Sequence, residues 1–353
     1  MKVYIRSAAA ISPQHSFKQE GLPADPVSYT TNRLKVIEPD YKAYIDAKLI
    51  RRMSRIIRMG VAAAIQCLQD AGINMPDAIV TGTAYGCLED TGIFLTRIVE
   101  QQEEMLSPTA FIQSTHNTIG AQIALMLQCH NYNNTFTQRG HSFESALLDA
   151  MLLLKEQEAA TALVGSADEL TDISFDILNR FGLYRQSVTD NLQLLRTPGK
   201  GTIAGEGTAF FTLTADANAE NIAELEGLKT FYQPAGIDEV QQHIQEFLAS
   251  HKVNMKDIDL VLMGKNGDVA NDSLYEQLQQ SALAGIPSAY YKHLCGEYPT
   301  AVSFALWLAT QLLHTQQVPG TDSSPLTSKP VKRILIYNHD QFKYHSLLLV
   351  AAC

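Results

Sequence analysis

The stretch Thr135–Leu147, TFTQRGHSFESAL, runs from a short β-prone segment through a polar turn into an amphipathic helix. A sharp strand-to-helix turn is where several α/β enzymes present a nucleophile to a cleft. The turn contains no cysteine. Its residues are Gln138, Arg139, Gly140, His141 and Ser142. The functional prediction depends on the absence of that thiol.

Predicted strands and helices alternate on both sides of this turn. Apolar residues at helical spacing predict helices at Leu49–Ala71, Ile119–Leu127, Val240–Ala249, Leu274–Leu283 and Thr300–Leu313. Short β-prone runs predict strands at Ala78–Thr83, Ala160–Ser166, Thr208–Thr214, Asp259–Gly264, Ile286–Ala289, Arg333–Asn338 and Ser346–Ala351. This alternation is typical of a mainly parallel sheet that is covered on both faces.

The chain divides into two halves of similar coarse order. Near Asp216–Glu220 the composition turns acidic and rich in Ala and Asn, which places a boundary between residues 1–215 and 216–353. Each half ends in two β-prone runs, and we expect each pair to be antiparallel. A duplicated α/β unit accounts for this pattern.

Composition excludes several classes of protein. The 353 residues, 46% hydrophobic and 18% charged, describe an ordinary globular chain, and the net charge of −10 argues against a nucleic-acid binder. An acidic partner would need a local basic patch. The densest run of arginines, which we interpret as a solvated helix face, is Arg51, Arg52, Arg55 and Arg58.

Cysteine and histidine spacing predicts no metal site and no cofactor. The five cysteines lack metal-ligand or disulfide spacing, so we expect free thiols in a reducing, cytoplasmic setting. The ten histidines contain no HExxH-like pair. No apolar segment reaches the roughly 18 residues of a membrane span.

Five segments, taken in order, resemble the β-ketoacyl synthases of the thiolase fold. They are RRMSRIIRMGVAAAIQCLQDAGI (Arg51–Ile73), IVTGTAYGCLED (Ile79–Asp90), SPTAFIQSTHNTIGAQIAL (Ser107–Leu125), GEGTAFFTL (Gly205–Leu213) and KHLCGEYPTAVSFALWLA (Lys292–Ala309). The resemblance spans nearly the whole chain. It implies a thiolase-like duplicated α/β fold, layered α-β-α-β-α, with mixed five-stranded sheets.

The family's chemistry, as the resemblance implies it, uses a cysteine at a helix N-terminus, two histidines and a lysine. The nucleophile position falls at Arg139 if the helix's apolar face is aligned, and at Gly140 if the count starts from the following strand. Gln138 and His141 lie within one residue of these options. Ser142 falls where the family has a small residue after the nucleophile. We interpret His141 as a polar turn residue, because a base without a nucleophile does nothing.

Both histidine positions of the family are occupied by other residues. In MGKNGDVAND, Met263–Asp272, the first histidine position falls at Gly264, and Asp272 matches the acidic residue that closes the motif. In the KxxxGH segment the lysine is Lys292 and the histidine position holds Glu297. A carboxylate cannot donate a proton to an enolate near neutral pH unless its pKa is strongly raised. We therefore expect a Lys292–Glu297 salt bridge.

Two cysteines are alternative nucleophiles. Cys87 lies in the glycine turn after the first core strand, and Cys295 lies in a loop that borders the family's active-site cavity. Free buried cysteines are usually small hydrophobic residues, so we expect neither thiol to react. Candidates for an acyl pocket are His116, Phe143, Cys295 and Asn338.

Three replaced catalytic groups on a preserved scaffold resemble the chain-length-factor subunits of ketosynthases. The resemblance implies a non-catalytic subunit that pairs with an active ketosynthase as a heterodimer, lines its acyl tunnel and works with an acyl carrier protein. Members of that class commonly replace the cysteine by glutamine, and Gln138 adjoins the expected position. The implied setting is fatty acid or polyketide-type synthesis, with aryl polyene or flexirubin-type pigments as the pathway prediction.

Two further hypotheses come from other classes. One is an acyltransferase or thioester hydrolase that uses His141, Ser142 or Cys295 on a carrier-bound thioester. The other is a homodimeric module that only binds acyl chains or a carrier protein. A covalent adduct after incubation with an acyl thioester would support the first, and the lack of any ketosynthase partner would support the second.

Overall fold

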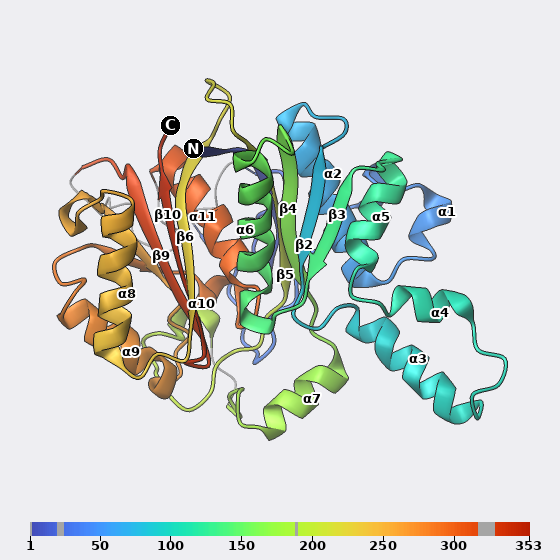
Figure 1. Ribbon diagram of the computed structural model, residues 1–353. Coiled ribbons are helices and arrows are strands. Elements are labelled where there is room, and N and C mark those ends of the chain that lie inside the picture. The colour runs from blue at the N-terminus through green and yellow to red at the C-terminus, as the bar shows by residue number, and fades with distance from the viewer. Residues whose placement is uncertain (1, 20–24, 188–189, 317–328) are drawn as a thin grey trace.

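A computed structural model describes residues 2–19, 25–187, 190–316 and 329–353. The strands within these residues are β1 Val3–Ile11, β2 Ala78–Gly82, β3 Tyr132–Phe136, β4 Thr161–Asp168, β5 Gly207–Thr214, β6 Ala223–Tyr232, β7 Leu260–Met263, β8 Ser288–Tyr290, β9 Arg333–Asp340 and β10 Tyr344–Ala351. The helices (Figure 1) are α1 Ala47–Ile50, α2 Arg55–Ala71, α3 Leu88–Glu100, α4 Pro108–Gln113, α5 Thr118–Leu127, α6 Ser142–Lys155, α7 Asp172–Arg180, α8 Ile237–Ser250, α9 Val269–Gln280, α10 Lys292–Cys295 and α11 Val302–Thr315.

The strands form one mixed sheet in the order β3-β2-β4-β5-β1-β6-β10-β9-β7-β8. Within the first five strands, β2 pairs parallel with β3 and β4, and β5 pairs antiparallel with β4 and β1. The last five repeat this pattern, since β7 pairs parallel with β8 and β9, and β10 pairs antiparallel with β9 and β6. The two five-stranded sheets implied by the resemblance are therefore present. A short antiparallel pairing of β1 with β6 joins them into one.

The layers follow the order α-β-α-β-α, as predicted. Figure 1 shows α6 and α11 between the two halves of the sheet. Buried residues of both halves, among them Val164 of β4 and Ile336 of β9, pack in one core with these helices. Helices α2 and α5 cover the outer face of the first half, and α8 and α9 cover that of the second. The N-terminus and the C-terminus of the chain, next to the start of β1 and the end of β10, lie close together at one end of the molecule (Figure 1).

The helix predicted at Leu49–Ala71 is two helices. Residues between Ile50 and Arg55 form a turn, and Ser54 has an extended backbone with φ −66° and ψ 171° that starts α2. Gly72 ends α2 with φ +66°, a left-handed conformation that glycine adopts without strain. The break leaves the first two arginines of the run on a surface turn.

Five helices and strands were not predicted: α3, α4, α7, α10 and β6. Helix α3 leaves Ile93, Leu95 and Val99 exposed, so its apolar residues do not mark one buried stripe. Strand β6, AELEGLKTFY, alternates charged and apolar residues just after the acidic segment, where composition predicts only a boundary. The boundary at residues 215 and 216 itself stays a prediction.

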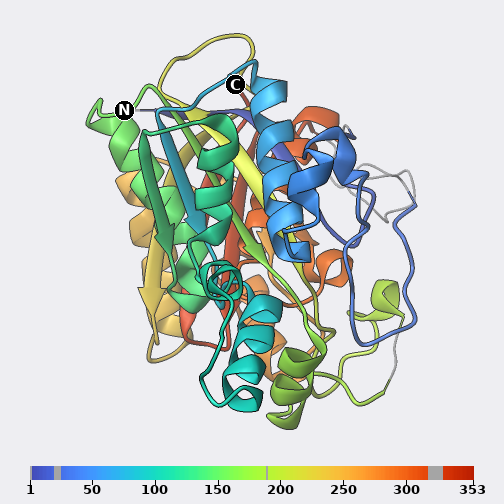
Figure 2. The ribbon, with the colours of Figure 1, turned by 90° about the vertical axis from the view of Figure 1, so that its right-hand side faces the viewer.

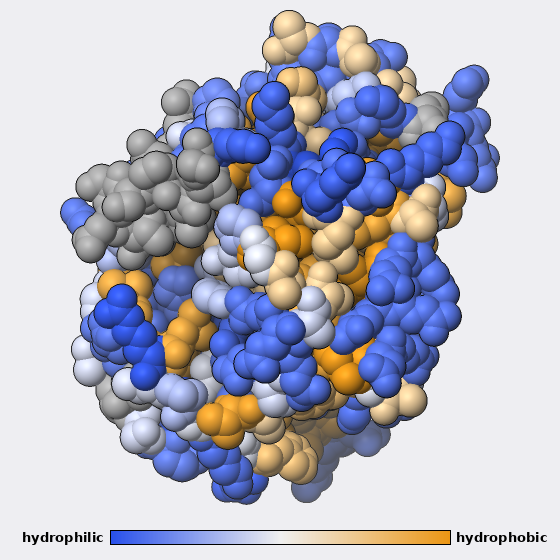
Figure 3. All heavy atoms as spheres, turned by 90° about the vertical axis from the view of Figure 1, so that its left-hand side faces the viewer, coloured by the Kyte–Doolittle hydropathy of each residue, from blue (hydrophilic) through white to orange (hydrophobic). Residues whose placement is uncertain are grey.

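Figure 2 shows α3 and α7 side by side at the end of the molecule opposite the chain termini. The side that carries β8, α8 and α9, shown in Figure 3, is covered mostly by hydrophilic side chains, with hydrophobic ones between them. In the described part of the chain, no helix has the length and apolar character needed to cross a lipid bilayer.

Candidate functional site

A single hydroxyl closes the turn between β3 and α6. Ser142 Oγ accepts a hydrogen bond from the backbone N–H of Gln138 at 2.8 Å and donates one to the carbonyl oxygen of Arg139 at 2.8 Å. The Ser142 side chain is fully buried. The hydroxyl thus uses its donor and one acceptor site on the backbone of the turn, and the serine holds the turn in place.

Of the two predicted nucleophile positions, one has no room for a side chain. A Cβ atom added at Gly140 would lie 2.8 Å from Tyr344 Cβ and 2.9 Å from Asp340 Cβ, closer than real Cβ contacts. Arg139 has φ +51°, an uncommon conformation for a residue other than glycine. Its exposed guanidinium lies 5.8 Å from the centre of the Tyr85 ring. At this turn the structure presents an exposed cation.

His141 packs against the C-terminal half of the chain. Its Nε2 lies 3.1 Å from the carbonyl oxygen of His345, and its ring meets that of Tyr344 edge-on at 5.1 Å. Burial lowers the pKa of His141 below its usual value of 6.5. The ring joins the two halves of the molecule, and it has no nucleophile beside it to activate.

The loop after β7 is packed closely against side chains of β9 and α9. A Cβ atom at Gly264 would lie 2.2 Å from Asn338 Oδ1 and 2.8 Å from the Tyr275 hydroxyl. The carboxylate of Asp272 accepts hydrogen bonds at 2.9 Å from the backbone N–H groups of Asn266 and Gly267. The packing leaves no space for an imidazole at position 264.

The predicted salt bridge between Lys292 and Glu297 is confirmed. Lys292 Nζ, on a side chain that is 1% exposed, lies 2.7 Å and 2.9 Å from the two carboxylate oxygens of Glu297. Asn266 Nδ2 donates a further hydrogen bond to the same carboxylate at 2.6 Å. Lys292 and Asn266 together hold the Glu297 carboxylate in place with three hydrogen bonds.

A small cavity of about 50 Å³ lies beside this pair. Its walls include Tyr85, Tyr184, Glu297 and Asp340. Burial raises the pKa of Asp340 to about 7, and the nearby negative charge of Glu297 acts in the same direction. Sequence reasoning missed Asp340 and Tyr85. Only the folded chain shows that the hairpin between β9 and β10 packs against the turn after β3.

The four acyl-pocket candidates do not line this cavity. Phe143 and Asn338 are buried, and Asn338 Oδ1 accepts a hydrogen bond from the Tyr291 hydroxyl at 2.8 Å. Cys295 is fully buried, and burial raises the pKa of its thiol well above 9.0. His116 is exposed and packs on Gly86. Their role in an acyl pocket stays a prediction.

Cys87 is also a buried free thiol, and burial raises its pKa as well. Since the thiolate is the nucleophilic form, neither Cys87 nor Cys295 is chemically prepared to react. Among the residues that the structure describes, no group of three His, Cys, Asp or Glu side chains is arranged to hold a metal ion.

The run of four arginines is not one solvated face, contrary to the prediction. Arg51 and Arg52 are exposed, but Arg55 reaches inward. Its guanidinium forms two hydrogen bonds to the fully buried carboxylate of Glu206, one of them at 2.7 Å, and a third to Glu38 at 2.6 Å. The pairing removes Arg55 from the surface charge and ties α2 to β5.

Known proteins resemble this chain in sequence over part of its length and in fold over all of it. Residues 32–199 match the model of the beta-ketoacyl synthase N-terminal domain. None of the curated proteins matches the sequence. Among solved structures, the ishigamide ketosynthase/chain length factor has a TM-score of 0.81 at 17% identity, covering 100% of this chain and 99% of that chain.

Two further solved structures are similar along their whole length. The ketosynthase ApeO in complex with its chain length factor ApeC, from Xenorhabdus doucetiae, has a TM-score of 0.77 at 15% identity, covering 100% of this chain and 98% of that chain. AntDE:AntF, a type II polyketide synthase acyl-carrier protein in complex with its ketosynthase, has a TM-score of 0.76 at 13% identity, covering 100% and 99%. Residues 32–199 are therefore similar to the N-terminal domain of beta-ketoacyl synthases, and the full chain has the fold of these solved structures.

Proposed function

We propose that this chain is a chain-length-factor-type subunit that has no catalytic activity of its own and pairs with an active ketosynthase. The observation that carries the proposal is the state of three inherited positions. Of the two predicted nucleophile positions Arg139 carries a side chain and Gly140 has no room for one, Gly264 is packed against Asn338, and Glu297 is held by Lys292. Thioester formation needs a thiolate, and decarboxylation needs donors aimed at the developing enolate. The described site supplies neither.

The surface around β3 supports pairing with another subunit. Strand β3 is the last strand of the sheet on its side, so no described strand pairs with its outer edge. Near it in the chain, large apolar side chains are exposed on α4 and α5 and in the turn before α4. They are Met105, Phe111, Ile112 and Leu125. A surface of this kind is typical of a protein–protein interface.

In the proposed complex, apolar side chains from this surface line part of the partner's acyl cavity and so influence product length. An acyl carrier protein, which is acidic, docks on the exposed positive charges at Lys48, Arg51 and Arg52. Neither Arg51 nor Arg52 takes part in an ion pair among the described residues, so their charges are available. The product class proposed is an aryl polyene or a flexirubin-type pigment.

The test is reconstitution with a candidate ketosynthase. Co-expression is expected to give a stable heterodimer that extends acyl chains on a carrier protein, while this chain alone produces no condensation. A matched control replaces the cysteine of the partner by alanine, which is expected to abolish the activity of the complex. Condensation of malonyl thioesters by this chain alone would refute the proposal.

Intact-mass measurement separates the remaining hypotheses. After incubation with an acyl thioester, the wild-type chain is expected to carry no acyl adduct, because Ser142 holds the turn and Cys295 is buried. An adduct that is lost in Ser142→Ala or Cys295→Ala would establish acyl transfer or hydrolysis instead. A stable homodimer that binds no ketosynthase would favour the acyl- or carrier-binding module.

A further inference from the structure

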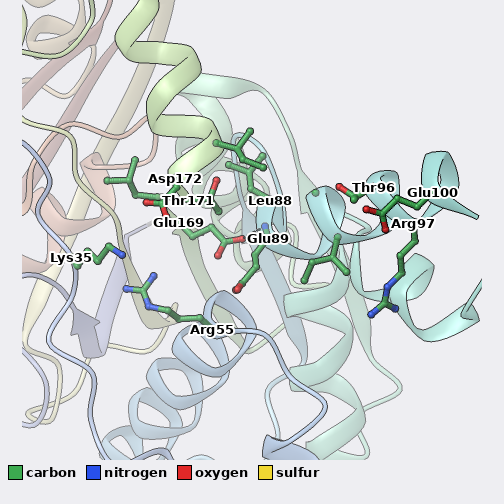
Figure 4. A pocket seen from close by; sticks show the side chains of 14 residues that line it. Lys35, Arg55, Leu88, Glu89, Thr96, Arg97, Glu100, Glu169, Thr171 and Asp172 are labelled. Carbon is green, nitrogen blue, oxygen red and sulfur yellow. Dashed lines mark hydrogen bonds between the residues drawn. The ribbon is translucent and has the colours of Figure 1, made fainter.

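A hollow of about 580 Å³ lies between α3 and α7, away from the site described above. Figure 4 shows Leu88, Glu89 and Glu100 of α3 on one wall and Asp172 of α7 on the other. This volume lies within the range of pockets that bind sizeable ligands or several side chains of a partner. We call it the α3–α7 groove.

Apolar side chains border the groove without any covering element. Ile93 of α3 and Ile173 of α7 line it and are 43% and 64% exposed. Ile177 and Phe181 follow Ile173 at intervals of four residues, on the same face of α7, and are 50% and 77% exposed. Such a row of exposed large apolar residues on a folded chain marks a surface that another molecule covers.

The charge around the groove is unevenly distributed. On the α7 wall, Arg33 forms ion pairs with Asp172 at 2.5 Å and with Asp176 at 3.5 Å, so these carboxylates are already neutralised. The α3 wall and the turn after it have no such partner in the described residues. The carboxylates without an ion pair there are Glu89 and Glu100, which line the groove, and Glu103 and Glu104 in the turn just beyond it. Arg97 of α3 and the exposed Lys35 are the lining cations without an ion pair among the described residues.

We propose that the α3–α7 groove binds an amphipathic helix of another protein, with its apolar face in the groove and its basic residues along α3. An amphipathic helix laid in an apolar groove anchors through side chains three and four residues apart, and the row on α7 has that spacing. The acidic α3 wall selects a basic partner and disfavours an acidic one. Neither Arg51 nor Arg52 lines the groove, and the proposal does not depend on ketosynthase pairing.

A model peptide tests the proposal on the full chain. The probe is a fluorescein-labelled Leu/Lys amphipathic helix of about five turns, long enough to be helical when bound. Fluorescence anisotropy is expected to show saturable binding that weakens as salt is added. Ile177→Ser combined with Phe181→Ser, and separately Glu100→Lys combined with Glu103→Lys, are each expected to weaken binding about tenfold or more.

Two controls separate the groove from general attraction to an acidic chain. Leu125→Ser removes an apolar side chain that is 67% exposed outside the groove, and binding is expected to stay as in the wild type. A peptide with Glu in place of Lys is expected not to bind. Binding that is equal in the groove variants, equal for the anionic peptide, or absent in the wild type would each overturn the proposal. All substituted positions are exposed, so circular dichroism is expected to show an unchanged fold.

Discussion

The first five strands and the last five strands follow the same order, yet the two outer edges of the sheet differ. The edge strand of the first half, β3, has five residues, whereas that of the second half, β8, has three. Of the 18 exposed large hydrophobic side chains in the described residues, 15 precede residue 215. The three in the second half are Tyr232, Val269 and Phe342.

The two halves also differ in their buried groups. The second half contributes the buried Lys292–Glu297 ion pair, whose two charges neutralise each other. It also contributes Gly264, which is closely packed on all sides that a Cβ atom would occupy. The first half contributes a turn whose arginine points outward. The difference teaches that the two halves of one duplicated frame have diverged: exposed apolar side chains gather on the first half, whereas these groups of the second half are packed or paired within the chain.

The largest expected effect tests the closed interior of the second half. Lys292→Met leaves the Glu297 carboxylate without its cation, and breaking a buried pair in this way costs about 3–5 kcal/mol of unfolding free energy. Urea denaturation measures the loss. The matched control is Lys229→Met, because Lys229 and Glu246 form a pair on the surface, where the cost is expected to be about 1 kcal/mol or less. Equal losses would show that the inner pair is not special.

The second prediction tests the open edge of the first half. Phe111→Asp places a charge on the proposed ketosynthase surface and is expected to weaken heterodimer formation about 100-fold, which corresponds to about 2.7 kcal/mol. Surface plasmon resonance with the partner ketosynthase measures this affinity. The control is Tyr232→Asp, an exposed aromatic residue of the second half with 56% exposure, for which no change is expected. If both variants weaken pairing alike, the asymmetry between the halves has no functional meaning.

The third prediction tests the packing at the lost histidine position. Gly264→Ala forces a methyl group against Asn338 and Tyr275, and overpacking of this kind costs about 1–3 kcal/mol. The control is Gly236→Ala, because no atom lies within 4 Å of a Cβ there. Thermal denaturation of both variants is the measurement. A neutral Gly264→Ala would mean that the site retains room for a side chain.

The smallest expected effect concerns the boundary between the halves and depends on pH. Burial raises the pKa of Glu144, on α6, from its usual value of 4.5 to about 7. Both of its carboxyl oxygens lack a hydrogen-bond partner among the described residues. The folded state therefore holds the proton more tightly than the unfolded state, and stability falls as pH rises from about 4.5 to about 7.

Glu144→Gln removes this titration while keeping the size of the side chain. The variant is expected to gain about 1–2 kcal/mol of stability over the wild type at pH 8 and little at pH 5. Urea titrations at the two pH values measure the difference. Asp340 and Glu169 also have pKa values raised to about 7, so a weaker pH dependence is expected to remain. A gain of equal size at both pH values would point to packing, with no role for ionisation.

Much of the fold was predictable because it depends on local patterns. Helical spacing located the strong helices, and short β-prone runs located most strands to within a few residues. Helices α3 and α7 were missed because their exposed apolar residues serve no internal core. These exposed apolar residues do not follow the periodicity of a buried helix face, and they also make the two helices candidates for binding a partner.

The residue types at the candidate site can be read from the sequence, but the packing and the electrostatic surroundings of these residues cannot. The absence of cysteine at the turn, and of histidine at positions 264 and 297, can be read directly from the sequence, and so can the Lys292–Glu297 pair. The crowding at Gly140 comes from Tyr344, which is more than 200 residues away in the chain. The raised pKa of Asp340 likewise depends on neighbours brought together only by folding.

The sequence by itself determined the alternation of strands and helices, the duplicated plan and the residue types at the turn and at positions 264 and 297, because each is a property of residue order. Only the tertiary structure decided which positions have room for side chains, which arginine is buried against Glu206 and which sheet edge is left open. The physical reason is that space, burial and charge pairing are set by contacts between residues far apart in the chain.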